Sequence, residues 1–191
     1  PYTYPYKIYP ILFEPERSIR QQPYPEKMMN GADIIQPMQY IDLFTLSASE
    51  YQEKVYNYII DNLKTENVSF ETLESFGYTV LTPLVKALNM VYPNNNFIAN
   101  KNVRHELLYG LEGLRSVMDY SEDKREYIYK KNIVDTYGRI FSRENIAKYS
   151  PKIKNIIDSI ETSTGIILIY SNYFEAGFFP MALALEEFGS K

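Results

Sequence analysis

The stretch that decides the fold is Tyr149-Ser-Pro-Lys-Ile-Lys-Asn-Ile-Ile-Asp-Ser-Ile160, followed after a short break by Gly165-Ile-Ile-Leu-Ile-Tyr-Ser171. In the first part, Ser150-Pro151 is typical of a helix start and the isoleucines recur on one helix face. In the second part, the unbroken apolar run predicts a strand that is covered on both faces, as in a parallel sheet. A further helix is predicted up to Gly189, which places the loop Ser171–Gly177 at the carboxyl end of the strand, where open α/β sheets bind ligands.

The residues before this unit predict a helical region. Gln39–Leu46 is rich in β-branched and aromatic residues and predicts a half-buried strand. The capping box Ser47-Ala-Ser-Glu50 then predicts a helix to about Leu63, and Thr82-Pro83 predicts the start of a short helix. Two more helices are predicted on either side of a polar bend, over 103–118 and from the bend at 119–125 to about 137.

The expected fold is therefore α/β and helix-rich, in three parts. Residues 1–30 form an arm rich in proline and tyrosine, residues 31–148 a helical region with a strand near 39–46, and residues 149–191 an incomplete strand and helix unit. Six of the 11 prolines lie in residues 1–25, and proline disfavours helix in the residue before it. We expect this arm to be extended along a surface, with disorder as the alternative.

Composition excludes several classes of protein. A net charge of −4 argues against a generally cationic nucleic-acid coat, and the absence of cysteine excludes disulfide frameworks and thiolate metal sites. No apolar run reaches the roughly 18 residues that span a bilayer, so we expect a soluble, intracellular protein without a membrane partner. The charge is uneven, however, because residues 124–154 carry nine basic and three acidic side chains.

Motifs for catalysis are absent from the sequence. It contains no Gly-x-x-x-x-Gly-Lys-Ser/Thr phosphate loop and no adjacent Asp-Glu pair for magnesium. The single histidine, His105, is expected in a surface or capping role. No residue is therefore assigned to catalysis, to cofactor binding or to a metal.

Tyrosines and basic residues are interleaved between positions 124 and 154. Such a mixture combines attraction to phosphates with stacking on bases, and it makes Lys148 and Lys152 candidate nucleic-acid contacts. The alternative is that the tyrosines pack in the core and the charges lie on solvated faces.

Three blocks of the sequence resemble a known family. Tyr149–Ile160 together with Gly165–Tyr173 and Ala176–Gly189 resembles the start of the second RecA-like lobe in superfamily-2 helicases. Thr45–Tyr56 is similar to the element that follows the first lobe in Swi/Snf-type ATPases, and Leu84–Pro93 is similar to the short helix that comes next. The phrases Tyr-Ser-Asn-Tyr and Ala-Gly-Phe-Phe-Pro-Met-Ala-Leu-Ala-Leu-Glu resemble the ATPases of nucleocytoplasmic large DNA viruses, of the pox-, asfar- and mimivirus type.

The resemblance implies a fragment of a nucleic-acid-dependent ATPase, spanning the region between the lobes and the start of the second lobe. ATP and magnesium would bind elsewhere in the parent protein and not to this fragment. Ser171 and Asn172 would fall in helicase motif IV, which faces the nucleic-acid backbone, and Tyr170 and Tyr173 would help to shape that surface.

The partners implied are nucleic acid, DNA rather than RNA, and the remaining helicase lobe. The process implied is viral transcription or replication, in the host cytoplasm, a viral factory or the virion. A non-enzymatic helical module that binds other proteins is the alternative, and a small hydrolase has little support.

Overall fold

The computed structural model describes Asp33, residues 46–65 and residues 78–189. Its contacts divide the chain into two units, Pro1–Thr45 and Leu46–Lys191. Asp33, which is exposed, is the described residue of the first unit. The predicted arm of residues 1–30 and the predicted strand near 39–46, apart from Leu46, lie outside the described residues, so the following concerns the second unit.

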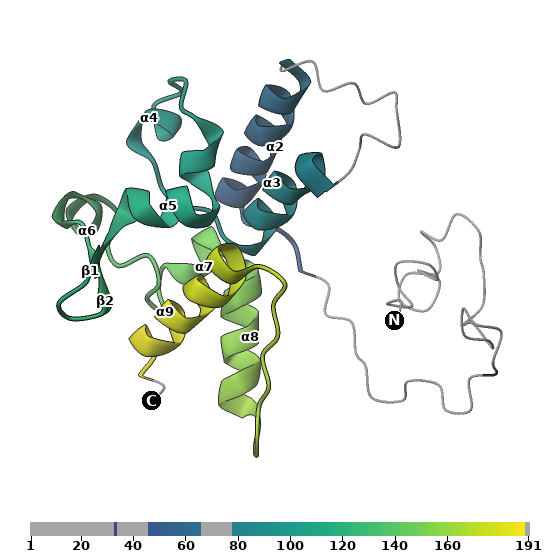
Figure 1. Cartoon of the computed structure of the whole chain (residues 1–191), viewed down its shortest axis with the longest axis vertical. Helices are drawn as coiled ribbons and strands as arrows, with labels where there is room; N and C mark the ends of the chain where they lie inside the picture. Colours follow the sequence, from purple (N-terminus) through teal and green to yellow (C-terminus); the bar gives the residue numbers. More distant parts are fainter. Residues whose placement is uncertain (1–32, 34–45, 66–77, 190–191) are drawn as a thin grey trace. The chain divides into compact units, whose positions relative to one another are not determined.

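The described part of the second unit is built from helices and one hairpin. Figure 1 shows α2 and α3 next to each other, with α7, α8 and α9 below them. The elements in chain order are α2 (Glu50–Thr65), α3 (Tyr78–Asn89), α4 (Asn95–Ile98), the 3-10 helix η3 (His105–Leu108), α5 (Gly110–Val117), β1 (Met118–Ser121), β2 (Glu126–Tyr129), α6 (Lys131–Tyr137), α7 (Ile146–Tyr149), α8 (Pro151–Thr162), the π-helix η4 (Phe174–Phe178) and α9 (Phe179–Glu187).

Helix α2 confirms the helix predicted to about Leu63, and its apolar residues form one buried stripe. Val55 and Ile59 are fully buried, and Tyr51 and Leu63 are buried at the two ends of the stripe. The cap, however, is Ser49, whose Oγ accepts a hydrogen bond from the backbone N–H of Gln52 at 3.0 Å. The serine next to the first helical residue therefore satisfies one of the free N–H groups of the first turn.

Helix α3 begins before the proline at which the sequence predicted its start. Its first residue is Tyr78, so Pro83 lies inside the helix. Proline removes one backbone donor from the helix. Packing of α3 against α2, including a hydrogen bond of 2.8 Å from Gln52 Nε2 to Ala87 O, helps to offset that loss.

The segment after α3 passes through the centre of the core. Met90, Val91 and Tyr92 are fully buried. Their backbone is satisfied by distant elements, since the N–H of Val91 donates to Tyr149 O and the N–H of Tyr92 donates to Leu108 O. This segment therefore joins α7 to η3. Buried N–H groups need an acceptor within the protein because water cannot reach them.

The helix predicted over 103–118 is wrong in its continuity. It is divided into η3 and α5 at Tyr109, which forms an isolated bridge with Val91, and at Gly110, which has a φ of +61°. Gly113 permits close packing, because an added Cβ would lie 2.4 Å from the buried ring of Tyr92.

A hairpin replaces the beginning of the helix predicted to end near Tyr137. Strands β1 and β2 pair in antiparallel register from Met118 opposite Tyr129 to Ser121 opposite Glu126. Arg125, in the turn, has a φ of +54°. Only α6, Lys131–Tyr137, is helical here, because the alternation of exposed and half-buried residues over 126–129 suits a strand.

The final unit confirms its two helices but not its strand. Ser150 caps α8 by accepting from the N–H of Ile153, and Pro151 is at the start of the helix, as predicted. Residues 166–171 belong to no strand or helix. The described chain is thus helix-rich with a two-stranded antiparallel sheet, and none of the helices within 46–65 and 78–189 has the length and apolar character needed to cross a membrane.

Candidate functional site

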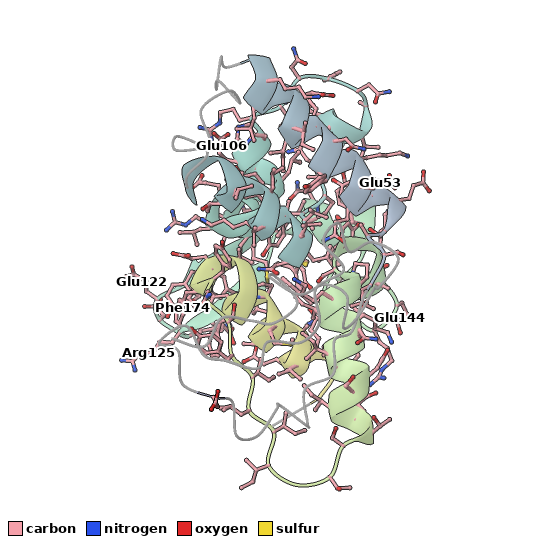
Figure 2. All side chains as sticks on the ribbon, turned by 90° about the vertical axis from the view of Figure 1, so that its right-hand side faces the viewer. Glu53, Glu106, Glu122, Arg125, Glu144 and Phe174 are labelled. Atoms are coloured by element: carbon pink, nitrogen blue, oxygen red, sulfur yellow. The ribbon has the colours of Figure 1, made fainter. Side chains whose placement is uncertain are left out.

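The segment between α8 and η4, residues 163–173, is apolar and exposed. Ile166 exposes 102%, Leu168 92% and Tyr170 76% of their surfaces. Ile169, in contrast, is half-buried and packs against the core. Ile167 is also exposed, at 43%, so the segment contacts the body of the protein mainly through Ile169. Figure 2 shows the segment as the loop below the helices.

Ser171, Asn172 and Tyr173 form a tight turn at the end of this segment. The hydroxyl of Ser171 accepts from the N–H of Tyr173 at 3.1 Å and donates to the carbonyl of the same residue at 3.0 Å. The hydroxyl of Tyr170 donates to Asn172 Oδ1 at 2.5 Å. Ser171 and Asn172, predicted to fall in helicase motif IV, thus lie in one turn with Tyr173, predicted to shape the same surface, and Asn172 is exposed.

Gly177 allows this turn to close against η4. A Cβ at this glycine would lie 2.2 Å from Ser171 Oγ. The N–H of Phe178 donates to Tyr173 O at 3.0 Å and holds the other end of the turn. Phe174, labelled in Figure 2, stacks on Phe178 with ring centroids 5.4 Å apart, and both rings are largely exposed.

The two candidate lysines lie on either side of the start of α8. Lys148 is exposed, and its ammonium lies 5.9 Å from the ring centre of Tyr51 and 5.5 Å from that of Tyr149. Lys152 Nζ donates to Asn89 Oδ1 at 2.7 Å, and partial burial lowers its pKa. Within the described residues, no hydrogen bond or ion pair links either lysine to the turn at Ser171–Tyr173.

Most of the other basic side chains in the stretch 124–154 are engaged with carboxylates of the same chain. Five of the nine form ion pairs, and the pairs are Lys124–Glu126, Lys130–Asp119, Arg139–Glu187, Arg143–Glu161 and Lys154–Asp158. A paired cation attracts a phosphate less than a free one. The basic character seen in the sequence is therefore partly neutralised by folding.

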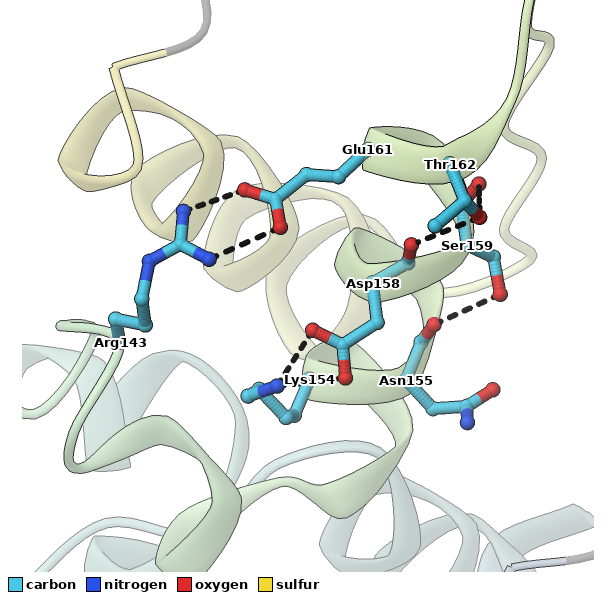
Figure 3. A network of polar contacts seen from close by, with 7 residues as sticks. All are labelled: Arg143, Lys154, Asn155, Asp158, Ser159, Glu161 and Thr162. Atoms are coloured by element: carbon cyan, nitrogen blue, oxygen red, sulfur yellow. Dashed lines mark hydrogen bonds and ion pairs between the residues drawn. The ribbon is translucent and has the colours of Figure 1, made fainter.

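Arg143 and Lys154 hold the outer face of α8 (Figure 3). Both terminal nitrogens of Arg143 donate to Glu161, and the guanidinium carbon lies 4.4 Å from the ring centre of Phe188. Arg143 lowers the pKa of the Glu161 carboxyl. Lys154 donates to both oxygens of Asp158, one turn further along the helix. Arg143 thereby joins the loop before α7 to the ends of α8 and α9.

Glu187 is the most enclosed of the paired carboxylates, with 10% of its side chain exposed. It accepts from Arg139 Nε at 3.1 Å and from the hydroxyl of Tyr129 at 2.5 Å. The same hydroxyl of Tyr129 accepts from the N–H of Phe141 at 3.0 Å. This arrangement fastens the end of α9 to the hairpin and to the loop that follows α6.

The tyrosines of the basic stretch serve mainly as packing residues. Tyr149 is 1% exposed, and burial raises its pKa to about 12. Tyr129 and Tyr137 are half-buried, and the hydroxyl of Tyr137 donates to Asn95 Oδ1. Of the two alternatives for these aromatic side chains, the structure favours core packing over a stacking platform for bases.

His105 is not on the surface, contrary to the prediction. It is 9% exposed, its Nδ1 lies 2.9 Å from the hydroxyl of Tyr109, and the two rings stack. The 3-10 turn places its side chain against the ring of Tyr109, so burial and not capping explains the residue.

Other hollows and clusters offer little chemistry. A hollow of about 180 Å³ is lined largely by amide side chains, namely Asn94, Asn95, Asn96 and Asn132, together with Pro93, Ser116, Ile133 and Tyr137. In the part of the chain that the structure describes, no three His, Cys, Asp or Glu residues gather as metal ligands would.

Sequence reasoning missed the carboxylate partners of the basic stretch. The spacing of four residues between Lys154 and Asp158 within a predicted helix is a signal that could have found one of them. Arg143 and Glu161 are 18 residues apart, and Arg139 and Glu187 are 48 apart, so only folding brings them together.

Comparison of the chain with protein-family models, with curated proteins and with solved structures finds no match.

Proposed function

We propose that this chain is part of a nucleic-acid-dependent ATPase of the superfamily-2 helicase type. In this proposal, residues 31–148 belong to the region between two RecA-like lobes, and residues 149–191 are the start of the second lobe. The process served would be viral DNA transcription or replication, in the host cytoplasm, a viral factory or the virion.

The observation that carries the proposal is the exposed apolar segment between α8 and η4. Ile166 and Leu168 are almost fully exposed although two ordered helices flank them. A strand from the interior of a parallel sheet has this appearance when its neighbouring strands are not part of the chain, because both of its faces are apolar. The turn at Ser171–Tyr173 then lies at the carboxyl end of that strand, where α/β folds bind ligands.

Nucleic acid would be contacted by this turn and by Lys148 and Lys152, neither of which forms an ion pair with a carboxylate of the described residues. Asn172 offers an exposed amide, and the Ser171 hydroxyl holds the turn in shape. Lys148 and Lys152 supply positive charge at the start of α8, where the helix dipole also favours an anion. ATP and magnesium would bind to motifs of the parent protein outside these residues.

Binding of labelled single-stranded DNA to the purified chain, followed by fluorescence anisotropy at low salt, tests the proposal. We expect Lys148→Glu with Lys152→Glu to weaken binding by at least about tenfold, since the affinity for a polyanion depends strongly on the number of phosphate contacts. Asn172→Ala should weaken it less. Lys54→Glu with Lys64→Glu, at two exposed lysines of α2, is the control that changes the net charge equally.

Equal losses in both double variants would contradict the proposed site, since they would show an effect of net charge alone. Absence of DNA binding by the unsubstituted chain would contradict the nucleic-acid function. It would leave the second candidate, a helical module that binds other proteins. That candidate is favoured by the five internal ion pairs, which use more than half of the basic side chains in the stretch 124–154.

A further inference from the structure

Residues 165–171 belong to no helix or strand, and their backbone groups are open to pairing. Among the described residues, no backbone hydrogen bond uses an N–H or C=O group of residues 165–170. An unpaired row of such groups is a template for another strand. The outward side chains of Ile166, Leu168 and Tyr170 would lie on one face of the resulting ladder.

The chemistry of this segment limits what can pair with it. No charged residue and no proline lies between Glu161 and Glu175, and the residues of the segment are those that favour strands. A partner strand must therefore be apolar and uncharged on the face that meets Ile166, Leu168 and Tyr170.

We propose that the segment pairs with the same segment of a second copy of this chain, in antiparallel register about a two-fold axis at Leu168. Ile166 then lies opposite Tyr170 of the other copy, Ile167 lies opposite Ile169, and the two Leu168 side chains face each other. Aliphatic and aromatic cross-strand pairs of this kind stabilise antiparallel ladders, and no like charges meet. A two-fold axis makes the contact closed, so that it stops at two copies.

The size of the contact sets its strength. A standard interface buries about 800 Å² of surface on each partner. Three outward side chains per copy bury less than that. The dimer is therefore weak, and its population depends on protein concentration.

The pairing does not rest on the proposed function. The proposed function assigns both edges of the segment to neighbouring strands of the parent protein, so the pairing concerns this chain without those strands. Of the nucleic-acid contacts proposed above, Lys148, Lys152, Asn172 and Tyr173 lie outside the segment, and Ser171 is its last residue.

Sedimentation over a concentration series tests the pairing. The average mass of the unsubstituted chain rises with protein concentration from 22.4 kDa towards twice that value. Leu168→Lys and Leu168→Glu each remain monomeric at every concentration, because two like charges then face each other across the axis. Residue 168 is 92% exposed, so neither substitution disturbs the core, and unchanged far-UV circular dichroism verifies this.

An equimolar mixture of the Leu168→Lys and Leu168→Glu proteins restores the dimer, since opposite charges then meet at the axis. Leu88→Lys, at an exposed leucine of α3, is the matched control and dimerises as the unsubstituted chain does. The proposal is overturned if the unsubstituted chain stays monomeric at every concentration. It is also overturned if the mixture of the two Leu168 variants stays monomeric. Binding of single-stranded DNA separates the two proposals, because the mixture binds as the average of the two Leu168 variants alone when the dimer plays no part in that binding.

Discussion

Arg139 and Glu187 are joined by a hydrogen bond of 3.1 Å from Nε to Oε2, across 48 residues of sequence. Glu187 also accepts from the hydroxyl of Tyr129. The pairing raises the pKa of the Arg139 guanidinium, chiefly through the hydrogen bond to Glu187. The end of α9 is therefore held by a carboxylate that has two donors and little contact with water.

Replacement of Glu187 by alanine should destabilise the protein. The substitution leaves the Tyr129 hydroxyl and the Arg139 guanidinium without their acceptor, and a lost acceptor for partly buried donors costs roughly 1 to 3 kcal/mol. Arg139 is largely exposed, so most of this loss should come from Tyr129. The free energy of unfolding in urea measures it. Glu186→Ala, at the exposed neighbouring carboxylate, should change that energy by less than about 0.5 kcal/mol.

Gly113→Ala should also destabilise the chain, although alanine favours helices. The added methyl group would lie 2.4 Å from the ring of Tyr92, which is fully buried and cannot move aside easily. Overpacking of this kind costs roughly 1 to 3 kcal/mol. The cost should fall when the same substitution is made in a Tyr92→Leu background, as a double-mutant cycle of thermal unfolding would show. Equal costs in both backgrounds would exclude the ring as the cause.

Ser150→Ala should weaken the start of α8. The Ser150 hydroxyl accepts from the N–H of Ile153 at 3.0 Å and donates to Asn89 O at 2.5 Å, so it both caps the helix and ties it to α3. Loss of a helix cap costs about 1 to 2 kcal/mol. Ser159→Ala removes an exposed hydroxyl from the same helix and is the control, with an expected change below about 0.5 kcal/mol. Equal losses in unfolding energy for the two variants would show that the cap contributes nothing of its own.

Alkaline pH should unfold the protein through its buried tyrosines. Burial raises the pKa of Tyr149 from 10.0 to about 12 and also raises the pKa values of Tyr51, Tyr92 and Tyr129. A raised folded-state pKa gives stability that is complete below the unfolded pKa and is lost as pH rises through the folded one. The unfolding free energy should therefore stay constant up to about pH 10 and fall between pH 10 and 12, and less steeply in Tyr149→Phe. Phenolate absorbance that rises fully before unfolding begins would contradict this.

Helix boundaries were predictable where a cap and an apolar stripe coincide. Ser150-Pro151 with its isoleucines specified α8, and the stripe from Tyr51 to Leu63 specified the buried face of α2. The hairpin at 118–129 and the break at Gly110 were not predicted, because a short polar turn and a left-handed glycine leave no periodic pattern in the sequence. The turn at Ser171–Tyr173 was foreseen as a loop, whereas its closure on Gly177 was not.

What the sequence determined by itself is local: which residues start and end helices, and which side of each helix is apolar. These follow from interactions within a few residues, which the order of side chains specifies directly. The tertiary structure decided which charges remain available, because Arg139 and Arg143 meet Glu187 and Glu161 only after α8 and α9 have packed. It also decided that Ile166, Leu168 and Tyr170 face solvent, since burial of an apolar strand requires neighbours that lie far away in the chain or in another molecule.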